Sequence, residues 1–335
     1  MKFKSIEFKD DKLILIDQRK LPDKEEYFIC KDYKDVEYSI REMVVRGAPA
    51  IGSVAAYGVA LSAIDNPPED EFYKRCEFIK QSRPTAVNLF WAVDRMFEAM
   101  EGDKEIDYDM LKIEADKIYE EDIKTNKRMA HIGNEIIKEN STILTHCNTG
   151  ALATVAYGTA LGVIREAHYT GKNIFVYADE TRPRLQGARL TAWELVKEGI
   201  PSTLIADNVA ATLIRDKRID VILVGADRIA TNGDTANKIG TFMLSALAKL
   251  YDVPFYIVAP VTTIDFDIEK GDEIEIEERD ALEVIKVRNV QIAPLEMNVY
   301  NPAFDVTPHE NITGIITDKG IIYPPFYDNI KKSKE

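Results

Sequence analysis

An acidic residue follows an apolar run in the stretch Val221 to Gly240, which reads VILVGADRIATNGDTANKIG. The β-branched residues predict a strand that ends at Gly225, and Asp227 then opens a polar loop that leads into a predicted helix. In open α/β sheets, ligands bind beyond the carboxyl ends of the parallel strands, so Asp227 lies where an acid or a base could act. The alternative is that its carboxylate only caps the following turn.

A cysteine ends a second predicted strand, in the sequence TILTHCNTGALAT that begins at Thr142. At such a place Cys147 can be a nucleophile, an acid or base, or a small buried apolar side chain. Residues 148–150 (Asn-Thr-Gly) predict a helix start whose backbone N–H groups could receive an anion. Because side chains alternate along a strand, we expect His146 to point away from Cys147 and to have a structural role.

Polar side chains crowd the passage from a third predicted strand into the next helix, over residues 178–194 (ADETRPRLQGARLTAWE). A structural turn would need only one or two such side chains. The passage holds Asp179, Glu180, Thr181, Arg182, Arg184, Gln186 and Arg189. Their density predicts a polar ligand site, and a solvated loop is the alternative.

Arginines precede two predicted helices in the first third of the chain. Arg46 stands before Gly47-Ala48-Pro49, and Arg83 stands before Pro84-Thr85. A guanidinium beside the free N–H groups of a helix start suits a phosphate. Each arginine taken singly could equally be an ordinary surface residue. The prediction of a phosphate ligand therefore depends on the two arginines together with Lys238.

The periodicity of apolar residues predicts an α/β fold with two domains. Residues 1–30 hold short β segments, and apolar residues at three- and four-residue spacing then predict helices over 36–45, 51–64, 72–81, 86–100 and 110–137. After residue 140, short apolar runs alternate with amphipathic segments, which is typical of βαβ units and a mostly parallel sheet. We therefore expect a mainly helical domain over 1–138 with a small β start, and a Rossmann-like domain over 139–335.

Composition excludes several classes of function. With 335 residues, 45% of them hydrophobic and a net charge of −14, the chain lacks the cationic excess that nucleic acid or an anionic membrane requires. Its apolar runs fall short of a membrane span, and its N-terminus has no signal-type apolar region, so the expected location is the cytoplasm.

Cofactor and metal motifs are also missing from the sequence. There is no Walker loop, dinucleotide glycine fingerprint, HExxH or GxSxG motif. Cys30, Cys76 and Cys147 are far apart and show no C-x-x-C spacing, so neither a zinc site nor a disulfide framework is expected. We expect no cofactor.

Several long motifs in order resemble the methylthioribose-1-phosphate isomerases. This group lies within a wider family that includes ribose-1,5-bisphosphate isomerases and the alpha, beta and delta subunits of translation initiation factor 2B. The resemblance covers residues 17 to about 320. Its motifs are RGAPAIG, RPTAVNLFWA, ILTHCNTGALAT, ADETRPRLQGARLTAWEL, GADRIATNGDTANKIGT and NPAFDVTPHE.

The resemblance implies a cytoplasmic homodimer that isomerises a sugar phosphate in methionine salvage. By motif match, Cys147 and Asp227 would be the catalytic pair. The residues that would hold the substrate and its phosphate are Arg46, Gly47, Ala48, Arg83, Gln186, Asn237 and Lys238. The alternatives are a ribose-1,5-bisphosphate or 5-deoxyribose-1-phosphate isomerase, or a regulatory relative that binds a sugar or nucleotide phosphate without converting it. The Cys/Asp pair, residues 232–234 (Asn-Gly-Asp) and His309 resemble the methylthioribose branch.

The substrate of that branch has its phosphate on the anomeric oxygen, so the ring must open before isomerisation. Asp227 would protonate the ring oxygen, which requires a carboxyl kept partly protonated by an apolar surround or a partner. The opened cation at C1 could receive hydride from C2, or the C2 proton could pass to Cys147 through an enolate-like intermediate. The sequence leaves both routes open.

Overall fold

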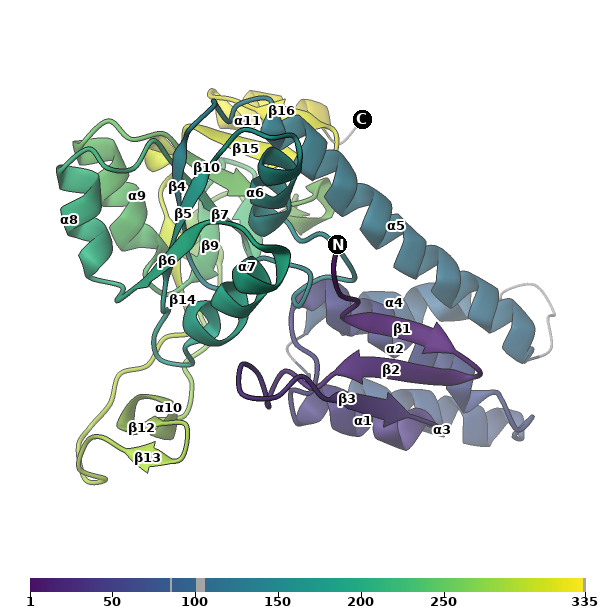
Figure 1. Ribbon diagram of the computed structural model, residues 1–335. Coiled ribbons are helices and arrows are strands. Elements are labelled where there is room, and N and C mark those ends of the chain that lie inside the picture. Colours follow the sequence, from purple (N-terminus) through teal and green to yellow (C-terminus); the bar gives the residue numbers. More distant parts are fainter. Residues whose placement is uncertain (85, 101–105, 334–335) are drawn as a thin grey trace. The chain divides into compact units, whose positions relative to one another are not determined.

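The computed structural model describes residues 1–84, 86–100 and 106–333 (Figure 1). The chain forms two compact units. Residues 1–126 and 150–158 make the first, and residues 127–149 and 159–335 make the second. The chain thus leaves the second unit just after residue 149 and returns to it at residue 159. The predicted division at residues 138 and 139 stays a prediction.

Helices dominate the first unit. Its antiparallel sheet, of order β1-β2-β3, consists of Ile6–Lys9, Lys12–Ile16 and Tyr27–Cys30. The helices that follow are α1 (Tyr33–Arg41), α2 (Ala48–Ser62), α3 (Glu69–Lys80) and α4 (Val87–Glu98), and α5 (Tyr108–Asn134) begins in this unit. Helix α2 carries small and apolar residues all round and is buried along its length, so it forms the centre of this core.

Residues 150–158 belong to the first unit through hydrogen bonds from three different parts of it. Gln18 Nε2 donates to the Leu152 carbonyl at 2.6 Å, and Ser5 Oγ donates to the Val155 carbonyl at 2.8 Å. The Val155 N–H donates to Asp122 Oδ2 at 2.8 Å. These bonds hold the segment as an irregular loop.

A seven-stranded sheet organises the second unit, in the order β16-β15-β10-β7-β4-β5-β6. All neighbours are parallel except β15 and β16. The strands are β4 (Thr142–Thr145), β5 (Phe175–Asp179), β6 (Ser202–Ile205), β7 (Val221–Val224), β10 (Phe255–Val258), β15 (Gly314–Thr317) and β16 (Gly320–Ile322). The chain order runs outward from β4 in one direction and then from β7 in the other, which is the Rossmann arrangement.

Helices cover both faces of this sheet. Strand β7 is buried throughout, and its alternate residues divide between two cores. Val221 and Leu223 join the core under α6 (Ala160–Tyr169) and α7 (Ala192–Glu198). Ile222 and Val224 join the core under α8 (Val209–Arg215), α9 (Thr241–Leu250) and α11 (Phe326–Ser333). Figure 1 shows these two layers of helices on either side of the sheet.

A smaller sheet and an arm complete the second unit. The sheet has the order β11-β8-β9-β14, formed by Ile264–Asp265, Arg228–Ala230, Thr235–Lys238 and Phe304–Thr307. The arm holds α10 (Leu282–Ile285), β12 (Lys286–Val287) and β13 (Val290–Gln291), and it stands apart from the rest of the unit in Figure 1. Short 3-10 turns occupy Val261–Thr263, Gly271–Glu273 and His309–Asn311, and a π-helical segment occupies Gly187–Thr191.

The predicted fold class is confirmed: a helical N-terminal region precedes a mostly parallel sheet. The predicted helix start at residues 148–150 is wrong, because α6 begins only at Ala160. Tyr157 and Gly158 have φ values of 68° and 87°, and this left-handed pair prevents a helix from running through the segment. Among the described helices, none is long and apolar enough to cross a membrane.

Candidate active site

The two predicted strand tips lie side by side at the crossover of the sheet. Strands β4 and β7 are parallel neighbours, and Thr145 lies opposite Leu223. The chain order reverses between these two strands, so the loops beyond them diverge and leave the crevice where ligands bind in such sheets. A Cβ atom built on Gly225 would come within 2.9 Å of Thr149 Cγ2, so the loops that carry Cys147 and Asp227 are in contact.

Cys147 is held in a left-handed backbone conformation, with a φ of 62°. Its N–H donates to Thr181 Oγ1 at 2.8 Å, and its carbonyl accepts from Thr191 Oγ1 at 2.6 Å. The thiol donates to Gln186 Oε1 across 3.6 Å. Since 8% of the residue is exposed, Cys147 is a buried side chain at a strand tip with every polar group directed by a neighbour.

Gln186 reaches the thiol from its position directly before the π-helical segment Gly187–Thr191. A Cβ atom on Gly187 would lie 1.7 Å from the Asp179 carbonyl oxygen, so only glycine permits the segment to approach the end of β5 this closely. The predicted polar passage therefore does reach the cysteine, through Gln186.

Asp227 stands at the base of the hairpin formed by β8 and β9. Its N–H donates to the Ala236 carbonyl at 2.9 Å. The side chain is exposed, so of the two ways in which we expected its carboxyl to stay partly protonated, an apolar surround or a partner, this structure does not show the first. The hairpin places Asn237 and Lys238 one strand away from Asp227, at the end of β9.

Asn237 and Lys238 are both buried, with 4% and 8% exposed. Asn237 Nδ2 donates to Thr241 Oγ1 at 3.0 Å. Lys238 Nζ donates to the Ala303 carbonyl at 2.8 Å and lies 4.4 Å from the centroid of the Phe304 ring. A carbonyl oxygen and an aromatic face therefore both contact the ammonium group.

His146 has the structural role that strand alternation predicts. Its Nδ1 lies 2.8 Å from Asp179 Oδ2, and its Nε2 lies 2.9 Å from the Ile239 carbonyl oxygen. Burial alone would lower the pKa of His146, but the Asp179 carboxylate and this carbonyl hold it above its ordinary value. The imidazole thus ties the tip of β4 to β5 and to the residue that follows Lys238.

A buried ionic network lies behind the cysteine. Arg165 on α6 is fully buried and pairs with Glu194 on α7, with Nη2 and Oε2 3.0 Å apart. Glu194 Oε1 accepts from Asn148 Nδ2 at 2.9 Å, and Asn148 follows Cys147 directly. Arg165, Glu194 and Thr191 were not predicted from the sequence as members of this site. Their only signal was polar character in otherwise apolar helices.

The remaining predicted residues belong to the first unit. Arg46, Gly47 and Ala48 lead into α2, and Arg83 lies before α4; Thr85 falls outside the described residues. Gly47 has a φ of 95°, and a Cβ atom there would lie 2.1 Å from the Ala153 carbonyl oxygen.

Helices α2 and α4 are in contact near their N-terminal ends. A Cβ atom on Gly52 would lie 3.1 Å from the Asn88 carbonyl oxygen, and both residues fall within the first two turns of their helices. Neither helix has a side-chain cap. Two helix starts preceded by arginines therefore lie in one part of this unit, as a phosphate site would require.

His309 and Asp234 form a structural contact. The His309 backbone N–H donates to Asp234 Oδ1, and His309 Nδ1 lies 2.8 Å from the same oxygen. The other oxygen, Asp234 Oδ2, accepts from Asn232 Nδ2 and from the Gly271 N–H. The carboxylate therefore joins the turn of the β8–β9 hairpin to two other loops. Residues 232–234 and His309, which match the motifs of the methylthioribose branch, thus shape the hairpin that follows Asp227.

Among the described residues, two groups of side chains have the composition of a metal site. His146, Asp179 and Asp207 form one, and Asp234, His309 and Glu310 form the other. Contacts within the protein engage both groups: His146 bonds with Asp179, Asp234 bonds with His309, and Glu310 lies 3.7 Å from His309 Nδ1. Asp207 accepts from the N–H groups of Thr181 and Arg182 at 2.6 and 2.8 Å, so its oxygens hold the loop after β5.

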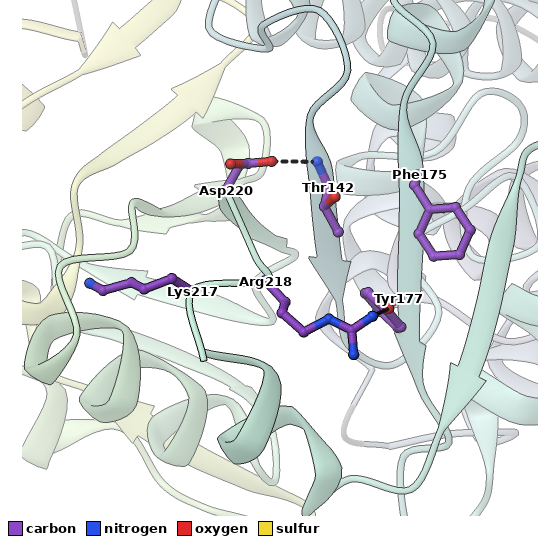
Figure 2. A pocket seen from close by; sticks show the side chains of 6 residues that line it. All are labelled: Thr142, Phe175, Tyr177, Lys217, Arg218 and Asp220. Carbon is purple, nitrogen blue, oxygen red and sulfur yellow. Dashed lines mark hydrogen bonds between the residues drawn. The ribbon is translucent and has the colours of Figure 1, made fainter. Parts of the chain in front are cut away.

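A surface hollow of about 490 Å³ lies elsewhere on the second unit, and Figure 2 shows its lining. Thr142 and Phe175 begin β4 and β5, and Asp220 precedes β7, so the hollow is at the amino edge of the sheet. Arg218 Nη2 donates to the Tyr177 hydroxyl at 3.0 Å, and Asp220 Oδ2 accepts from the Thr142 N–H at 2.7 Å. The candidate site is at the opposite edge, so this hollow is not part of it.

Comparison with known proteins identifies the family of this chain. The sequence model of the initiation factor 2 subunit family matches residues 44–324 of this chain. The chain belongs to this family. It is 69% identical over 341 residues to a methylthioribose-1-phosphate isomerase of Thermoanaerobacter pseudethanolicus, with 99% of each chain covered.

Two solved structures of the family are similar over nearly the whole chain. One is 5-methylthioribose 1-phosphate isomerase from Pyrococcus horikoshii OT3, with 46% identity, a TM-score of 0.94, and 98% of this chain and 95% of that chain covered. The other is described as translation initiation factor eIF-2B, subunit delta, from A. fulgidus, with 43% identity, a TM-score of 0.91 and 98% of each chain covered. Family membership and fold therefore do not by themselves separate an isomerase from a regulatory subunit.

Proposed function

We propose that this protein is an aldose–ketose isomerase that converts 5-methylthioribose 1-phosphate to 5-methylthioribulose 1-phosphate. The observation that supports the proposal is that β4 and β7, the strands after which Cys147 and Asp227 follow in the chain, are neighbours at the crossover of the sheet. The 69% identity to a protein named as this isomerase supports the choice of reaction. The step belongs to methionine salvage, and no cofactor takes part in it.

In the proposed reaction, Asp227 acts first as a general acid. It donates a proton to the ring oxygen, the bond from that oxygen to C1 breaks, and a cation stabilised by the phosphate-bearing oxygen forms at C1. Asp227 is exposed in this structure, and in the proposed reaction the bound substrate covers its carboxyl and excludes water from it.

Two routes lead from the opened cation to the ketose. In one, hydride moves from C2 to C1 and the C2 hydroxyl loses its proton. In the other, Cys147 removes the C2 proton as a thiolate to give an enol, C1 is then protonated, and the C2 hydroxyl loses its proton to form the carbonyl. The thiol donates to Gln186 Oε1 in this structure, so the second route requires that it first lose its proton. Deuterium placed at C2 is retained in the product by the first route and lost to water by the second.

We further propose that Arg46, Gly47, Ala48, Arg83, Gln186, Asn237 and Lys238 bind the substrate. The two arginine-led helix starts of the first unit suit the phosphate group, as does the buried ammonium group of Lys238. The active form is a homodimer in the cytoplasm. The resemblance to the isomerases supports both the homodimer and the cytoplasmic location.

The test is a side-by-side assay of purified protein on 5-methylthioribose 1-phosphate, ribose 1,5-bisphosphate and 5-deoxyribose 1-phosphate. We expect the highest kcat/KM on the first. Some activity on 5-deoxyribose 1-phosphate is expected, because an apolar pocket separates ligands that differ by one or two methylene equivalents by only about 1–3 kcal/mol. A preference for the bisphosphate would overturn the choice of substrate, and binding without turnover of any sugar would point to a regulatory protein, as the A. fulgidus structure is described.

A further inference from the structure

The backbone of Cys147 is in a conformation that a cysteine adopts only under constraint. A φ of 62° brings Cβ close to the following carbonyl oxygen, and residues other than glycine, asparagine and aspartate seldom accept it. Strained backbone of this kind persists where surrounding contacts impose it.

Two threonine hydroxyls supply those contacts, one on each side of the residue. Thr181 Oγ1 accepts from the Cys147 N–H at 2.8 Å, and Thr191 Oγ1 donates to the Cys147 carbonyl at 2.6 Å. Both threonines are buried, with 0% and 1% exposed. Water therefore cannot readily replace either bond, and the two hydroxyls together determine the direction of the Cα–Cβ bond.

The threonines are themselves fixed in place by further bonds. Thr181 donates from Oγ1 to the Asp179 carbonyl at 3.2 Å and from its N–H to Asp207 at 2.6 Å. Thr191 Oγ1 also accepts from Asn148 Nδ2 at 3.2 Å. Each hydroxyl thus has a defined donor and acceptor, so its orientation is set.

The π-helical segment connects the thiol contact with the backbone contact. Gln186 precedes the segment and Thr191 ends it, and these two residues contact the thiol and the carbonyl of the same cysteine. Single π-helical turns inside α-helices often occur at functional sites. Here the wider turn places both contacts on one residue.

We propose that Thr181 and Thr191 are positioning residues that hold Cys147 in its left-handed conformation and thereby aim its thiol. The inference rests on the proposed role of Cys147 in catalysis. Loss of either hydroxyl lets the residue relax toward an ordinary backbone conformation and moves the sulfur atom. A displacement of about 1 Å at a reacting group can cost about 100-fold in rate.

The test compares Thr181→Val and Thr191→Val with Thr181→Ser and Thr191→Ser. Valine keeps the shape of the side chain and removes the hydroxyl, whereas serine keeps the hydroxyl. The matched control is Thr317→Val, because Thr317 is also buried and donates to a backbone carbonyl, that of Gly320 at 2.8 Å, at the β15–β16 hairpin. Circular dichroism and the thermal midpoint establish that each variant is folded.

Two measurements are made on each variant. The first is kcat and KM on 5-methylthioribose 1-phosphate, where we expect the valine variants to lose about 10- to 100-fold in kcat with little change in KM, and the serine variants to recover most of it. The second is the rate at which iodoacetamide alkylates Cys147, located by mass spectrometry, which we expect to rise in the valine variants alone. Cys30 and Cys76 do not compete, because burial raises the pKa of each thiol to about 12.

The alkylation rate does not depend on the reaction that the protein catalyses. If Cys147→Ser keeps full turnover, the catalytic role of Cys147 fails, and the alkylation rates still decide whether the threonines aim the thiol. Wild-type kcat and wild-type alkylation rates in both valine variants would overturn the positioning role. An equal loss of kcat in Thr317→Val would overturn it as well.

Discussion

At the scale of single residues, polar contacts decide what Cys147, His146 and Lys238 can do. The Cys147 thiol hydrogen-bonds to an amide oxygen, and the His146 imidazole contacts a carboxylate and a carbonyl. The Lys238 ammonium group contacts a carbonyl and an aromatic ring. The sequence predicted the location of the first two at one strand tip and the structural role of His146. It could not predict the contacts, because their partners come from loops more than thirty residues away, at Asp179, Gln186 and Ile239.

The raised pKa of His146 leads us to expect that the stability of the protein depends on pH. Its pKa in the folded protein is raised above the value of about 6.5 that it has when unfolded. Its contribution to the free energy of unfolding is therefore fully present below about pH 6.5 and is lost as the pH rises through the folded-state pKa. Urea midpoints of the wild type measured from pH 6 to pH 9 should fall with rising pH, and His146→Gln should flatten that fall.

The control for this pH series is His131→Gln, since His131 is exposed on α5. It should leave the pH dependence of the midpoint as in the wild type. A wild-type midpoint that rises over the same interval would contradict a raised pKa of His146 in the folded protein.

We expect one methyl group added at Gly187 to lower the free energy of unfolding strongly. In Gly187→Ala the Cβ atom would meet the Asp179 carbonyl at 1.7 Å, and backbone on both sides has to move. We expect a loss of about 3 kcal/mol in the free energy of unfolding, at the upper end of what overpacking costs, together with a fall in kcat. Gly171→Ala is the control: its φ is 82° and it has open space around it, so the expected loss is about 1–2 kcal/mol with kcat retained. Equal losses in denaturant titrations of the two variants would refute the overlap as the cause.

At the scale of secondary-structure elements, an ion pair fixes α7 against α6. Arg165 on α6 faces Glu194 and Glu198, which are one turn apart on α7, and the three side chains are fully buried or nearly so. Removing one partner leaves a buried charge, which costs about 3–5 kcal/mol. We therefore expect Arg165→Ala to lower the free energy of unfolding by that amount, measured by chemical denaturation.

The control for Arg165 is Arg215→Ala. Arg215 pairs with Asp216 on the surface, where 58% and 45% of the two side chains are exposed. This variant should leave stability nearly unchanged. A comparable loss in both variants, or none in Arg165→Ala, would contradict the account of the buried pair.

Helices and core strands could be predicted from the sequence, and irregular elements could not. Periodic segments such as 110–137 and apolar runs such as 221–226 correspond to α5 and β7, because burial of one face or of both faces leaves a clear pattern. Strands β8, β9 and β14 form a small sheet from short polar segments and were missed. The helix start expected at 148–150 was wrong, since residues 150–158 are held by the first unit and form an irregular loop.

At the scale of the whole molecule, strand order brings together the two strands that precede Cys147 and Asp227. They are separated by two further strands along the chain, β5 and β6, yet β4 and β7 are adjacent in the sheet. The sequence predicted parallel strands but not their order, which depends on contacts between segments far apart. The pairing of the two residues therefore came from the family resemblance and stays a prediction, which the adjacency of β4 and β7 supports.

The proposed homodimer is tested by mass. Light scattering on material separated by size should give twice the chain mass of 37.9 kDa at micromolar concentration. A mass of one chain that stays constant across a hundredfold range of concentration, with full activity, would show that the active form is a monomer.

The most direct test of the central claim is the turnover of 5-methylthioribose 1-phosphate by the wild type, Cys147→Ser and Asp227→Asn, each with its substrate affinity measured by calorimetry. We predict that the wild type forms the ketose 1-phosphate, and that both variants bind the sugar phosphate with similar affinity but lose at least about a thousandfold in kcat, as removal of a reacting group does. Full turnover by either variant would contradict the assignment of that residue, and an inert wild type that binds the sugar phosphate would contradict the isomerase itself.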